Sequence, residues 1–466
     1  MANILNIKKG LDLPIAGAAT LRVAEALSID TYAVKPTDFV GLVPRLSVAE
    51  GDKVAAGDAL FVDKNNPDIR FTSPVAGSVK AVVRGEKRRL LAVVVQRDEQ
   101  AAAASFQVDA SSAEQVRSAM LRTGLWTMLR QRPFGTVANP TQTPKAIVVS
   151  AFDSAPLAAD TDFALQGRES FFTKGLDALA KLTDGPLHVS FRPEQKLMQA
   201  AHAASAKNIQ IHQVTGVHPA GNVGTQIAAF CPINKGDLVW TMGPQDVAVL
   251  GELVSTGVYN PVRVVAVAGP ACVDPHYYRV RCGAAVASIV KCQGAVTATA
   301  AGGATRIVSG NVLCGTQIAA DGYLSAYDAL ISMLPEGDYY DFMGWLLPGL
   351  KKFSFSRTFL SGFFAKCKCD ILGKCSCTAP KFDTNMHGSV RPLVFSGNFE
   401  QVFPFDIYPT QLIKACIIGD LELMENLGIY EVEPEDFALC EFIDPSKTDI
   451  QPIIREALEL LRKEAM

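Results

Sequence analysis

Four cysteines lie within eleven positions of the chain, in the stretch "CKCDILGKCSC" at residues 367–377. They are Cys367, Cys369, Cys375 and Cys377, out of 11 cysteines in 466 residues. Four thiolates can surround zinc tetrahedrally, and the turn residues "DILG" would let the two C-x-C halves face each other. Zinc sites more often use C-x₂-C, and the ligand spacing of ferredoxin-type iron–sulfur clusters is missing. A structural metal site, a loop of free or buried thiols, and a disulfide therefore all stay open.

No other motif points to a reaction. The sequence has no G-x-G-x-x-G, G-x-x-x-x-G-K-[ST], H-E-x-x-H or G-x-S-x-G, and no pair of its six histidines is spaced i, i+4. We expect these histidines to be partly buried or solvent-facing without a catalytic role. Cys272, Cys282 and Cys292 are spaced by ten, which matches no metal motif, so we expect buried core cysteines. The sequence identifies no catalytic residue, no metal ligand and no cofactor-binding residue.

The composition describes a folded protein with no general attraction to polyanions. Hydrophobic residues make up 48% and charged residues 20% of the chain, and the net charge is −3. This balance argues against disorder and against nucleic-acid binding. No apolar run reaches the roughly 18 residues of a membrane helix, and the N-terminus lacks the order of a signal peptide. We therefore expect a cytoplasmic protein of about three or four domains without a transmembrane segment.

Residues 38–97 alternate short Val-, Leu- and Phe-rich stretches with Gly, Pro, Asp or Asn. This pattern predicts an all-β module. "EGDKVAAGDALFVDK" followed by "FTSPVAGSVKAV" has the two-hairpin pattern of biotinyl/lipoyl-like domains. Lys64 lies at the tip where such domains carry a modifiable lysine, but the Met-Lys-Met-type frame is missing, so we predict no carrier function.

Residues 112–255 alternate helix-like and strand-like stretches, which predicts an α/β domain with a parallel sheet. "AEQVRSAMLRTGLWTMLRQR", "FFTKGLDALAKLT" and "EQKLMQAAHAASAK" are expected to be helical, and "KAIVVSAF", "LHVSFR" and "NIQIHQV" are expected to be strands.

The rest of the chain is predicted as a small α+β unit at 258–330 and a mostly helical part at 331–466. The tail "QPIIREALELLRKEAM" is an amphipathic helix with Ile454, Ala457, Leu458 and Leu461 on one face. The stretch 339–364 holds nine aromatic residues and the basic Lys351, Lys352 and Arg357. This mixture suits a surface that docks on a membrane protein, although ordinary core packing would explain it too.

Several strings along the whole chain resemble one family. They include "IKKGLDLPIAG" at 7–17, "GDALFVDKNNPDIRFTSPVAG" at 57–77, "HPAGNVGTQI" at 218–227, "GWLLPGLKKFSFSRTFLS" at 344–361 and "FPFDIYPTQLIKACIIGD" at 403–420. With its strings in this order, the chain resembles the NqrA family, the A subunits of the Na⁺-translocating NADH:quinone reductases. That family is related to the C subunit of the Rnf complex and to the flavin subunit of complex I.

The resemblance implies a multidomain α/β fold with four units. These are an N-terminal segment with a barrel-sandwich (biotinyl/lipoyl-like) β module at 1–100, a Rossmann-like α/β domain at 101–257, a β-grasp-like (SLBB-like) domain at 258–330 and a C-terminal helical domain at 331–466.

The flavin-binding relatives hold flavin on a glycine-rich loop that corresponds here to "LRTGLWTMLRQRPFGTVANP", 121–140. Gly124 is retained, but Arg130, Gln131 and Arg132 would occupy the cradle, so we expect the flavin and NADH site to be lost. The relatives also carry iron–sulfur cysteines near the C-terminus. This chain keeps only one of them, Cys440, and one cysteine cannot hold a cluster.

The resemblance therefore implies a structural, quinone-associated subunit of a respiratory sodium pump, without a redox cofactor of its own. It would lie peripherally on the cytoplasmic face of the bacterial inner membrane. Its partners would be the B to F subunits, which carry the flavins and iron–sulfur centres, and a quinone. The alternative is a soluble metal-binding protein centred on Cys367–Cys377.

Overall fold

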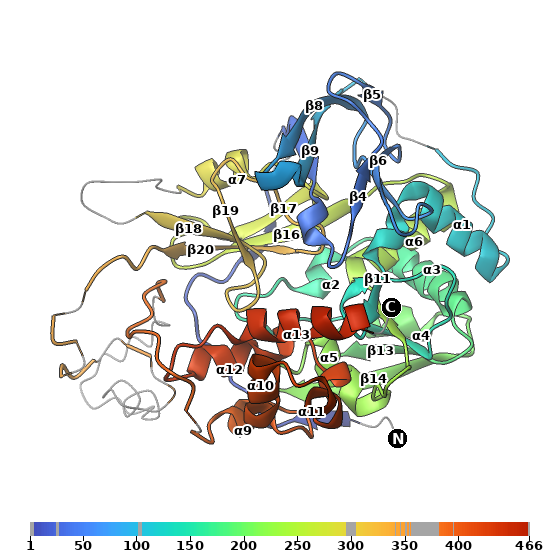
Figure 1. The fold of residues 1–466 in the computed structure, drawn as a ribbon. Helices are drawn as coiled ribbons and strands as arrows, with labels where there is room; N and C mark the ends of the chain where they lie inside the picture. The colour runs from blue at the N-terminus through green and yellow to red at the C-terminus, as the bar shows by residue number, and fades with distance from the viewer. Residues whose placement is uncertain are drawn as a thin grey trace.

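The computed structural model describes most of the chain, and Figure 1 shows how its parts are arranged. The described residues are 4–24, 28–100, 105–294, 304–340, 342–344, 346–349, 352–353, 355, 382–394 and 396–464. The cysteine cluster at 367–377 lies outside them, so the hypotheses on that cluster stay untested.

The N-terminal β module consists of two small antiparallel sheets with strand orders β3-β9-β8-β5 and β4-β6-β7. Phe61 and Phe71 stack in its core with ring centroids 4.8 Å apart, and both side chains are fully buried. The predicted all-β module is therefore confirmed. Its elements are β3 (Thr31–Val34), η1 (Pro36–Asp38), β4 (Pro44–Leu46), β5 (Lys53–Val54), β6 (Ala59–Asp63), β7 (Arg70–Thr72), β8 (Gly77–Arg84), η2 (Glu86–Arg88) and β9 (Leu90–Arg97).

The largest sheet has seven strands in the order β1-β14-β13-β12-β15-β10-β11. The neighbours from β1 to β15 pair in parallel, whereas β10 and β11 are antiparallel additions at one edge. β12, β13 and β14 confirm the three predicted strands. The strands are β1 (Ile4–Ile7), β10 (Arg130–Arg132), β11 (Thr136–Val137), β12 (Ala146–Ser150), β13 (Leu187–Phe191), β14 (Ile209–Gly216) and β15 (Val239–Thr241).

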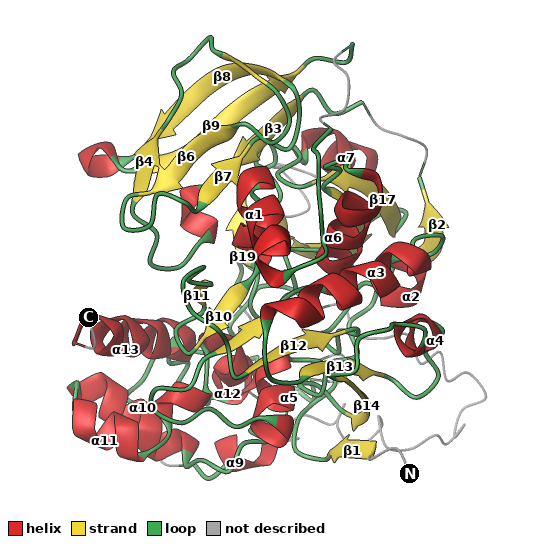
Figure 2. Cartoon of the chain, turned by 90° about the vertical axis from the view of Figure 1, so that its right-hand side faces the viewer, coloured by secondary structure: helices red, strands yellow, loops and turns green. Residues whose placement is uncertain are grey.

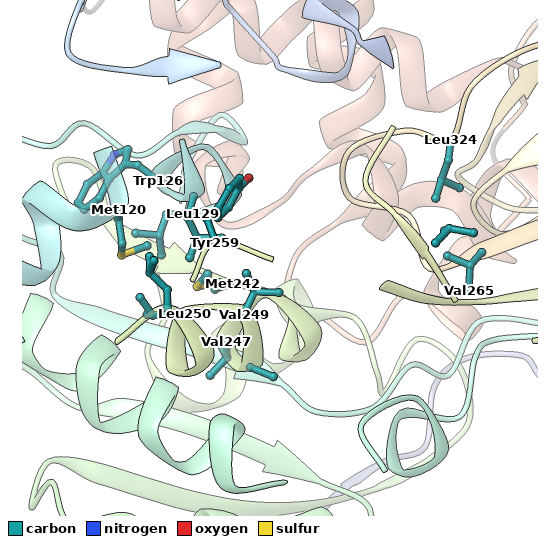
Figure 3. Packing of buried hydrophobic residues seen from close by; sticks show 14 of the residues in the cluster. Met120, Trp126, Leu129, Met242, Val247, Val249, Leu250, Tyr259, Val265 and Leu324 are labelled. Carbon is teal, nitrogen blue, oxygen red and sulfur yellow. The ribbon is translucent and has the colours of Figure 1, made fainter. Parts of the chain in front are cut away.

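Helices cover this sheet on both faces, with α3 and α6 on one face and α5 on the other (Figure 2). Figure 3 shows the core beside α6, where Met120, Trp126 and Leu129 meet Val249 and Leu250. The elements are α1 (Ala113–Thr123), η3 (Leu125–Met128), α2 (Thr161–Ala164), α3 (Glu169–Leu179), η4 (Ala180–Leu182), α4 (Leu197–His202), α5 (Val223–Phe230) and α6 (Pro244–Thr256).

A further sheet has six strands in the order β19-β18-β20-β16-β17-β2. The N-terminal segment thus contributes to two sheets, because β1 pairs with β14 and β2 pairs with β17. The elements are β2 (Thr20–Val23), β16 (Val262–Ala268), β17 (His276–Arg281), α7 (Ala287–Cys292), β18 (Thr305–Ser309), β19 (Thr316–Ile318) and β20 (Leu330–Pro335).

The C-terminal helices, drawn in orange to red in Figure 1, have a hydrophobic core of their own. The predicted tail helix is confirmed as α13, and its buried residues include the four expected ones, Ile454, Ala457, Leu458 and Leu461. The elements are α9 (Phe399–Val402), α10 (Pro409–Ile418), α11 (Leu421–Asn426), η5 (Ile429–Glu431), η6 (Pro434–Phe437), α12 (Ala438–Ile443) and α13 (Ile450–Glu464).

Two sequence expectations were wrong in detail. The helix expected over "AEQVRSAMLRTGLWTMLRQR" ends at Thr123, because Gly124 takes a left-handed conformation with φ 79° and caps α1. Left-handed backbone is readily available to glycine, and the chain continues into η3 and then β10. Cys292, expected in a buried core, is exposed at the end of α7.

We expect the close crossing of α3 and α6 to depend on glycine. A Cβ on Gly251 would lie 1.7 Å from the backbone oxygen of Phe171, and one on Gly175 would lie 1.9 Å from that of Val247. The substitution Gly251→Ala should lower the free energy of unfolding by about 1–3 kcal/mol through overpacking, although alanine is the better helix former. Chemical denaturation measures this loss. Lys174→Ala on the exposed side of α3 is the control and should change the free energy by less than about 0.5 kcal/mol. An equal effect of both variants would contradict the tight crossing.

Candidate functional site

A cavity of about 200 Å³ lies where the strand order of the parallel sheet reverses. From β12 the chain moves to β13 and β14 on one side, whereas β15 pairs with β12 on the other side. Ser150 at the end of β12 and Asp153 in the loop after it line the cavity, together with Gly243 before α6 and Gln245 in the first turn of α6. Parallel α/β sheets bind ligands at this switch point, outside the carboxyl ends of the strands. We call this space the switch-point cavity.

The six-stranded sheet closes the switch-point cavity through β16 and the start of β20. Arg263 of β16 donates to Asp246 in the first turn of α6 at 2.6 Å, and their side chains are only 3% and 9% exposed. Gln245 donates to the carbonyl of Val264 at 2.9 Å and accepts from its N–H at 2.8 Å. One wall is therefore held by a buried ion pair and by two hydrogen bonds to backbone.

Two further carboxyl groups face the switch-point cavity. Asp328 accepts a hydrogen bond from Ser309 Oγ at 2.6 Å, and burial raises its pKa. Asp153 lines the cavity from the loop after β12 and is exposed, and desolvation by the neighbouring protein raises its pKa as well. Raised pKa values increase the fraction of each carboxyl that is protonated and able to donate a hydrogen bond.

Tyr327 and Asn311 complete the polar lining. The Tyr327 hydroxyl donates to the carbonyl of Thr127 at 2.9 Å, and the guanidinium of Arg130 lies 5.0 Å from the ring centroid. The cation–π contact holds the ring at the cavity wall. The cavity thus combines apolar surface with a few fixed polar groups, as small-molecule sites do.

A second cavity of about 50 Å³ lies between the β module, η3 and α6. Its lining includes Lys35, Asp38, Phe71, Met128 and Cys282. This volume holds a few water molecules but no ring-sized ligand without rearrangement.

The loops after β12 and β14 meet next to the switch-point cavity. Ser154 Oγ lies 3.0 Å from Nδ1 of His218 and accepts a hydrogen bond from the N–H of Gly221 at 2.7 Å. Burial lowers the pKa of His218 to about 4, so the imidazole is neutral at physiological pH. This contact fixes the loop that carries Asp153.

The C-terminal helices are attached to the edge of the large sheet by ion pairs. Arg132 of β10 binds Glu435 and Asp436, the latter at 3.3 Å. Arg455 of α13 donates to the carbonyl of Phe134 at 2.7 Å and, within the C-terminal helices, pairs with Glu433 at 2.6 Å. Arg132, expected in a flavin cradle, lies instead in a strand with its guanidinium committed to this contact. Gln131 accepts from Nε1 of Trp240 at 3.3 Å.

Other residues singled out in the sequence lie away from the switch-point cavity. Gly124 packs against Thr72, since a Cβ there would lie 2.3 Å from Thr72 Oγ1. Cys440 is fully buried among the C-terminal helices. Lys64 is exposed just after β6, where its backbone N–H bonds the carbonyl of Val43.

The structure brings together two histidines that no sequence spacing connected. His188 of β13 and His212 of β14 lie 2.9 Å apart between ring nitrogens, and Phe230 stacks on His212. Burial lowers the pKa of His188 to about 4. Within the described part of the chain, no group of three or more His, Cys, Asp or Glu side chains is placed to hold a metal ion.

The key polar residues, Asp246, Arg263, Asp153 and Asp328, were missed in the sequence. A usable signal was present for one of them. Arg263 interrupts the apolar strand "VRVVAVA", and a buried arginine requires a buried partner. Nothing local identifies that partner as Asp246.

Three family models match the chain. The "NqrA N-terminal barrel-sandwich hybrid domain" matches residues 5–98, the "NqrA second alpha/beta domain" residues 111–259 and the "NQRA C-terminal domain" residues 264–320.

Curated relatives match over the full length. The proteins named as the A subunit of Na(+)-translocating NADH-quinone reductase from Yersinia pseudotuberculosis serotype O:1b and Haemophilus influenzae strain Rd are each 38% identical, and each alignment covers 99% of this chain and 100% of the relative. The protein of that name from Serratia proteamaculans is also 38% identical with the same coverage.

A NAD⁺-reducing [NiFe]-hydrogenase structure matches with a TM-score of 0.34 and 12% identity over 48% of this chain and 47% of that one, and we draw no conclusion from it. In the part of the chain that the structure describes, no helix is both long and apolar enough to cross a membrane.

We expect the Arg263–Asp246 pair to be important for stability. Asp246→Ala would leave the guanidinium of Arg263 buried without its counter-charge and should cost about 3–5 kcal/mol of the free energy of unfolding. Asp274→Ala is the matched control. It breaks the Arg22–Asp274 pair, whose side chains are both 58% exposed, and should cost less than about 1 kcal/mol. Urea denaturation of both variants compares the two losses, and similar losses would show that Arg263 is not buried in this way.

Proposed function

The chain belongs to the NqrA family, the A subunits of the Na(+)-translocating NADH-quinone reductases, and on that basis we propose that it is the peripheral, quinone-associated subunit of such an enzyme. The observation that carries the proposal is the identity of 38% over 99% of this chain and the whole of its relatives. In this role the chain acts within a translocase complex and does not catalyse the reaction alone. Its partners are the B to F subunits, and it lies on the cytoplasmic face of the inner membrane.

We propose four structural units, with the boundaries expected from the sequence. The barrel-sandwich module at 1–100 and the Rossmann-like domain at 101–257 precede the β-grasp-like domain at 258–330 and the helical domain at 331–466. The separate sheets and the separate C-terminal core support this division. The pairing of β1 and β2 with later strands means that the N-terminal segment also holds the units together.

Electrons of the complex travel, in this proposal, over flavins and iron–sulfur centres of the partner subunits. Arg130, Gln131 and Arg132 lie in β10, and the lining of the switch-point cavity has no glycine-rich loop from residues 121–140. Cys440 is enclosed by apolar helices. These placements support a subunit without a resident redox cofactor.

Exposed apolar side chains support contact with a membrane partner. Phe342, Leu346 and Leu347 in the aromatic stretch 339–364 are exposed, and so are Ile417 and Ile418 at the end of α10. Contiguous exposed apolar side chains mark interaction surfaces in soluble proteins.

The switch-point cavity is the place that best fits a quinone head group. Its volume of about 200 Å³ accommodates one substituted ring. A benzoquinone presents two carbonyl acceptors, and desolvation raises the pKa values of Asp153 and Asp328, which favours the protonated carboxyl that can donate a hydrogen bond. The apolar part of the lining, with Phe152, Ala164 and Leu330, suits the ring face.

Pull-down of the tagged full-length protein from detergent-solubilised membranes tests the proposed function. We expect membrane subunits of the reductase to co-purify, and the separately purified chain to show no flavin or iron–sulfur absorption. Recovery without any membrane subunit would refute the function, and a stoichiometric flavin spectrum would refute the absence of a cofactor.

Filling the cavity tests the quinone site. Ala159→Leu adds three carbons inside the switch-point cavity and should weaken binding of a water-soluble benzoquinone about tenfold or more, because each misplaced methylene costs that much in a fitted pocket. Calorimetric titration measures the affinity. It should also fall as the pH rises through the raised pKa values of Asp153 and Asp328, since the donated protons are then lost.

The matched control is Ala326→Leu, which makes the same change in the smaller cavity. We expect unchanged quinone affinity in this variant. A loss in Ala326→Leu together with normal binding in Ala159→Leu would move the quinone to the smaller cavity.

A further inference from the structure

One hairpin of the β module concentrates positive charge. Between residues 80 and 89 the chain has five basic side chains and a single acidic one, Glu86, although the whole protein has a net charge of −3. All five basic side chains are exposed. We call them the basic hairpin tip: Lys80, Arg84, Lys87, Arg88 and Arg89.

The backbone of the tip is held in one conformation. β8 and β9 pair along their length, and the turn between them is closed by hydrogen bonds from Gly85 N–H to the carbonyl of Arg89 at 2.9 Å and from Arg89 N–H to that of Glu86 at 3.1 Å. Lys87 and Arg88 have φ values of 52° and 60°. A left-handed backbone is costly for lysine and arginine. The turn nevertheless has two exposed cationic side chains at positions where glycine would adopt this backbone more easily.

Internal ion pairs do not neutralise the tip. Among the contacts of the described residues, none of the five basic side chains forms a salt bridge, and Arg84 instead donates a hydrogen bond to the carbonyl of Arg88. Glu50 reaches the hairpin through a hydrogen bond from Val82 N–H at 2.7 Å, and in the described residues it forms no ion pair with the five basic side chains. The positive charge is therefore available to an external partner.

The shape of the tip narrows the choice of partner. In Figure 2 the turn beyond the ends of β8 and β9 projects from the β module, away from the sheets of the rest of the molecule. Residues 80–89 include no aromatic side chain, and neither cavity is lined by them. Protein interfaces depend on aromatic and arginine anchors set in pockets, and single-stranded nucleic acids need aromatic platforms for stacking. A projecting turn with charge alone suits a broad anionic surface.

We propose that the basic hairpin tip binds the anionic phospholipid headgroups of a bilayer. Clusters of four to eight basic residues beside a membrane attract anionic lipids, and the attraction falls off within a Debye length. The exposed Val83 adds a small apolar contact next to Arg84. This contact gives the chain its own affinity for the bilayer, independent of any protein partner, and it goes beyond the role proposed above.

Vesicle flotation of the purified full-length protein tests the proposal. The wild-type protein should bind vesicles of phosphatidylglycerol and phosphatidylcholine at low salt, and it should not bind vesicles of phosphatidylcholine alone. The variant Lys87→Gln/Arg88→Gln/Arg89→Gln should bind the anionic vesicles about 100-fold more weakly, because each basic residue near the surface contributes about fivefold.

The control variant Lys174→Gln/Lys207→Gln/Lys291→Gln removes the same number of exposed charges from α3, the loop before β14 and α7. It should bind as the wild type does.

Equal binding by the tip variant and the wild type, or binding that does not depend on anionic lipid and salt, would overturn the proposal. If the tip variant no longer co-purifies with membrane partners and the wild type binds no vesicles, the tip belongs to a protein partner instead. Failure of the tip to bind vesicles would leave the wild-type co-purification result, and so the proposed function, unaffected.

Discussion

The buried ion pair between Arg263 and Asp246 determines how the six-stranded sheet meets the large parallel sheet. Each ion costs several kcal/mol to remove from water, and only close pairing with further hydrogen bonds offsets that cost. The 2.6 Å contact, with both side chains at 9% exposure or less, therefore allows little sliding of β16 against α6. Because these two elements form walls of the switch-point cavity, the cavity keeps its shape only while the pair is intact.

The same reasoning explains how the C-terminal helices are attached. Their core is largely their own, but Phe134 and Ala228 pack against it, so apolar contact and charge together hold the helices to the large sheet. Arg132 pairs with the fully buried Asp436 and with the partly exposed Glu435, and burial together with the neighbouring carboxylates raises the pKa of Asp436 to about 7. In a chain of net charge −3, acidic side chains thus gather at the contact with Arg132, and basic side chains gather at the exposed hairpin tip.

These features assign different tasks to different parts of the molecule. The switch-point cavity is internal, polar in a few fixed places and suited to a small ring. Phe342, Leu346 and Leu347 are exposed, as are Ile417 and Ile418 at the end of α10, and we propose these for contact with partner subunits. For the bilayer we propose the exposed charge of the basic hairpin tip.

Much of the secondary structure could be predicted from local pattern. The tail helix follows from apolar residues at helical spacing, and β12, β13 and β14 follow from short apolar runs between turn residues. The break at Gly124 was missed because helical periodicity continues past it, although a basic residue in the last turn, here Arg122, followed by glycine is a known helix end. The pattern of strings along the chain also identified the family.

The sequence by itself determined the type of many regular elements, the β module and the family, because each depends on residues close together in the chain or on matching strings. Only the tertiary structure decided the switch-point cavity, the Arg263–Asp246 pair and the contact between His188 and His212. The cavity joins Ser150, Gly243 and Asp328 through the order of strands in the sheet. That order is set by packing between distant segments, and no local spacing of residue types records it.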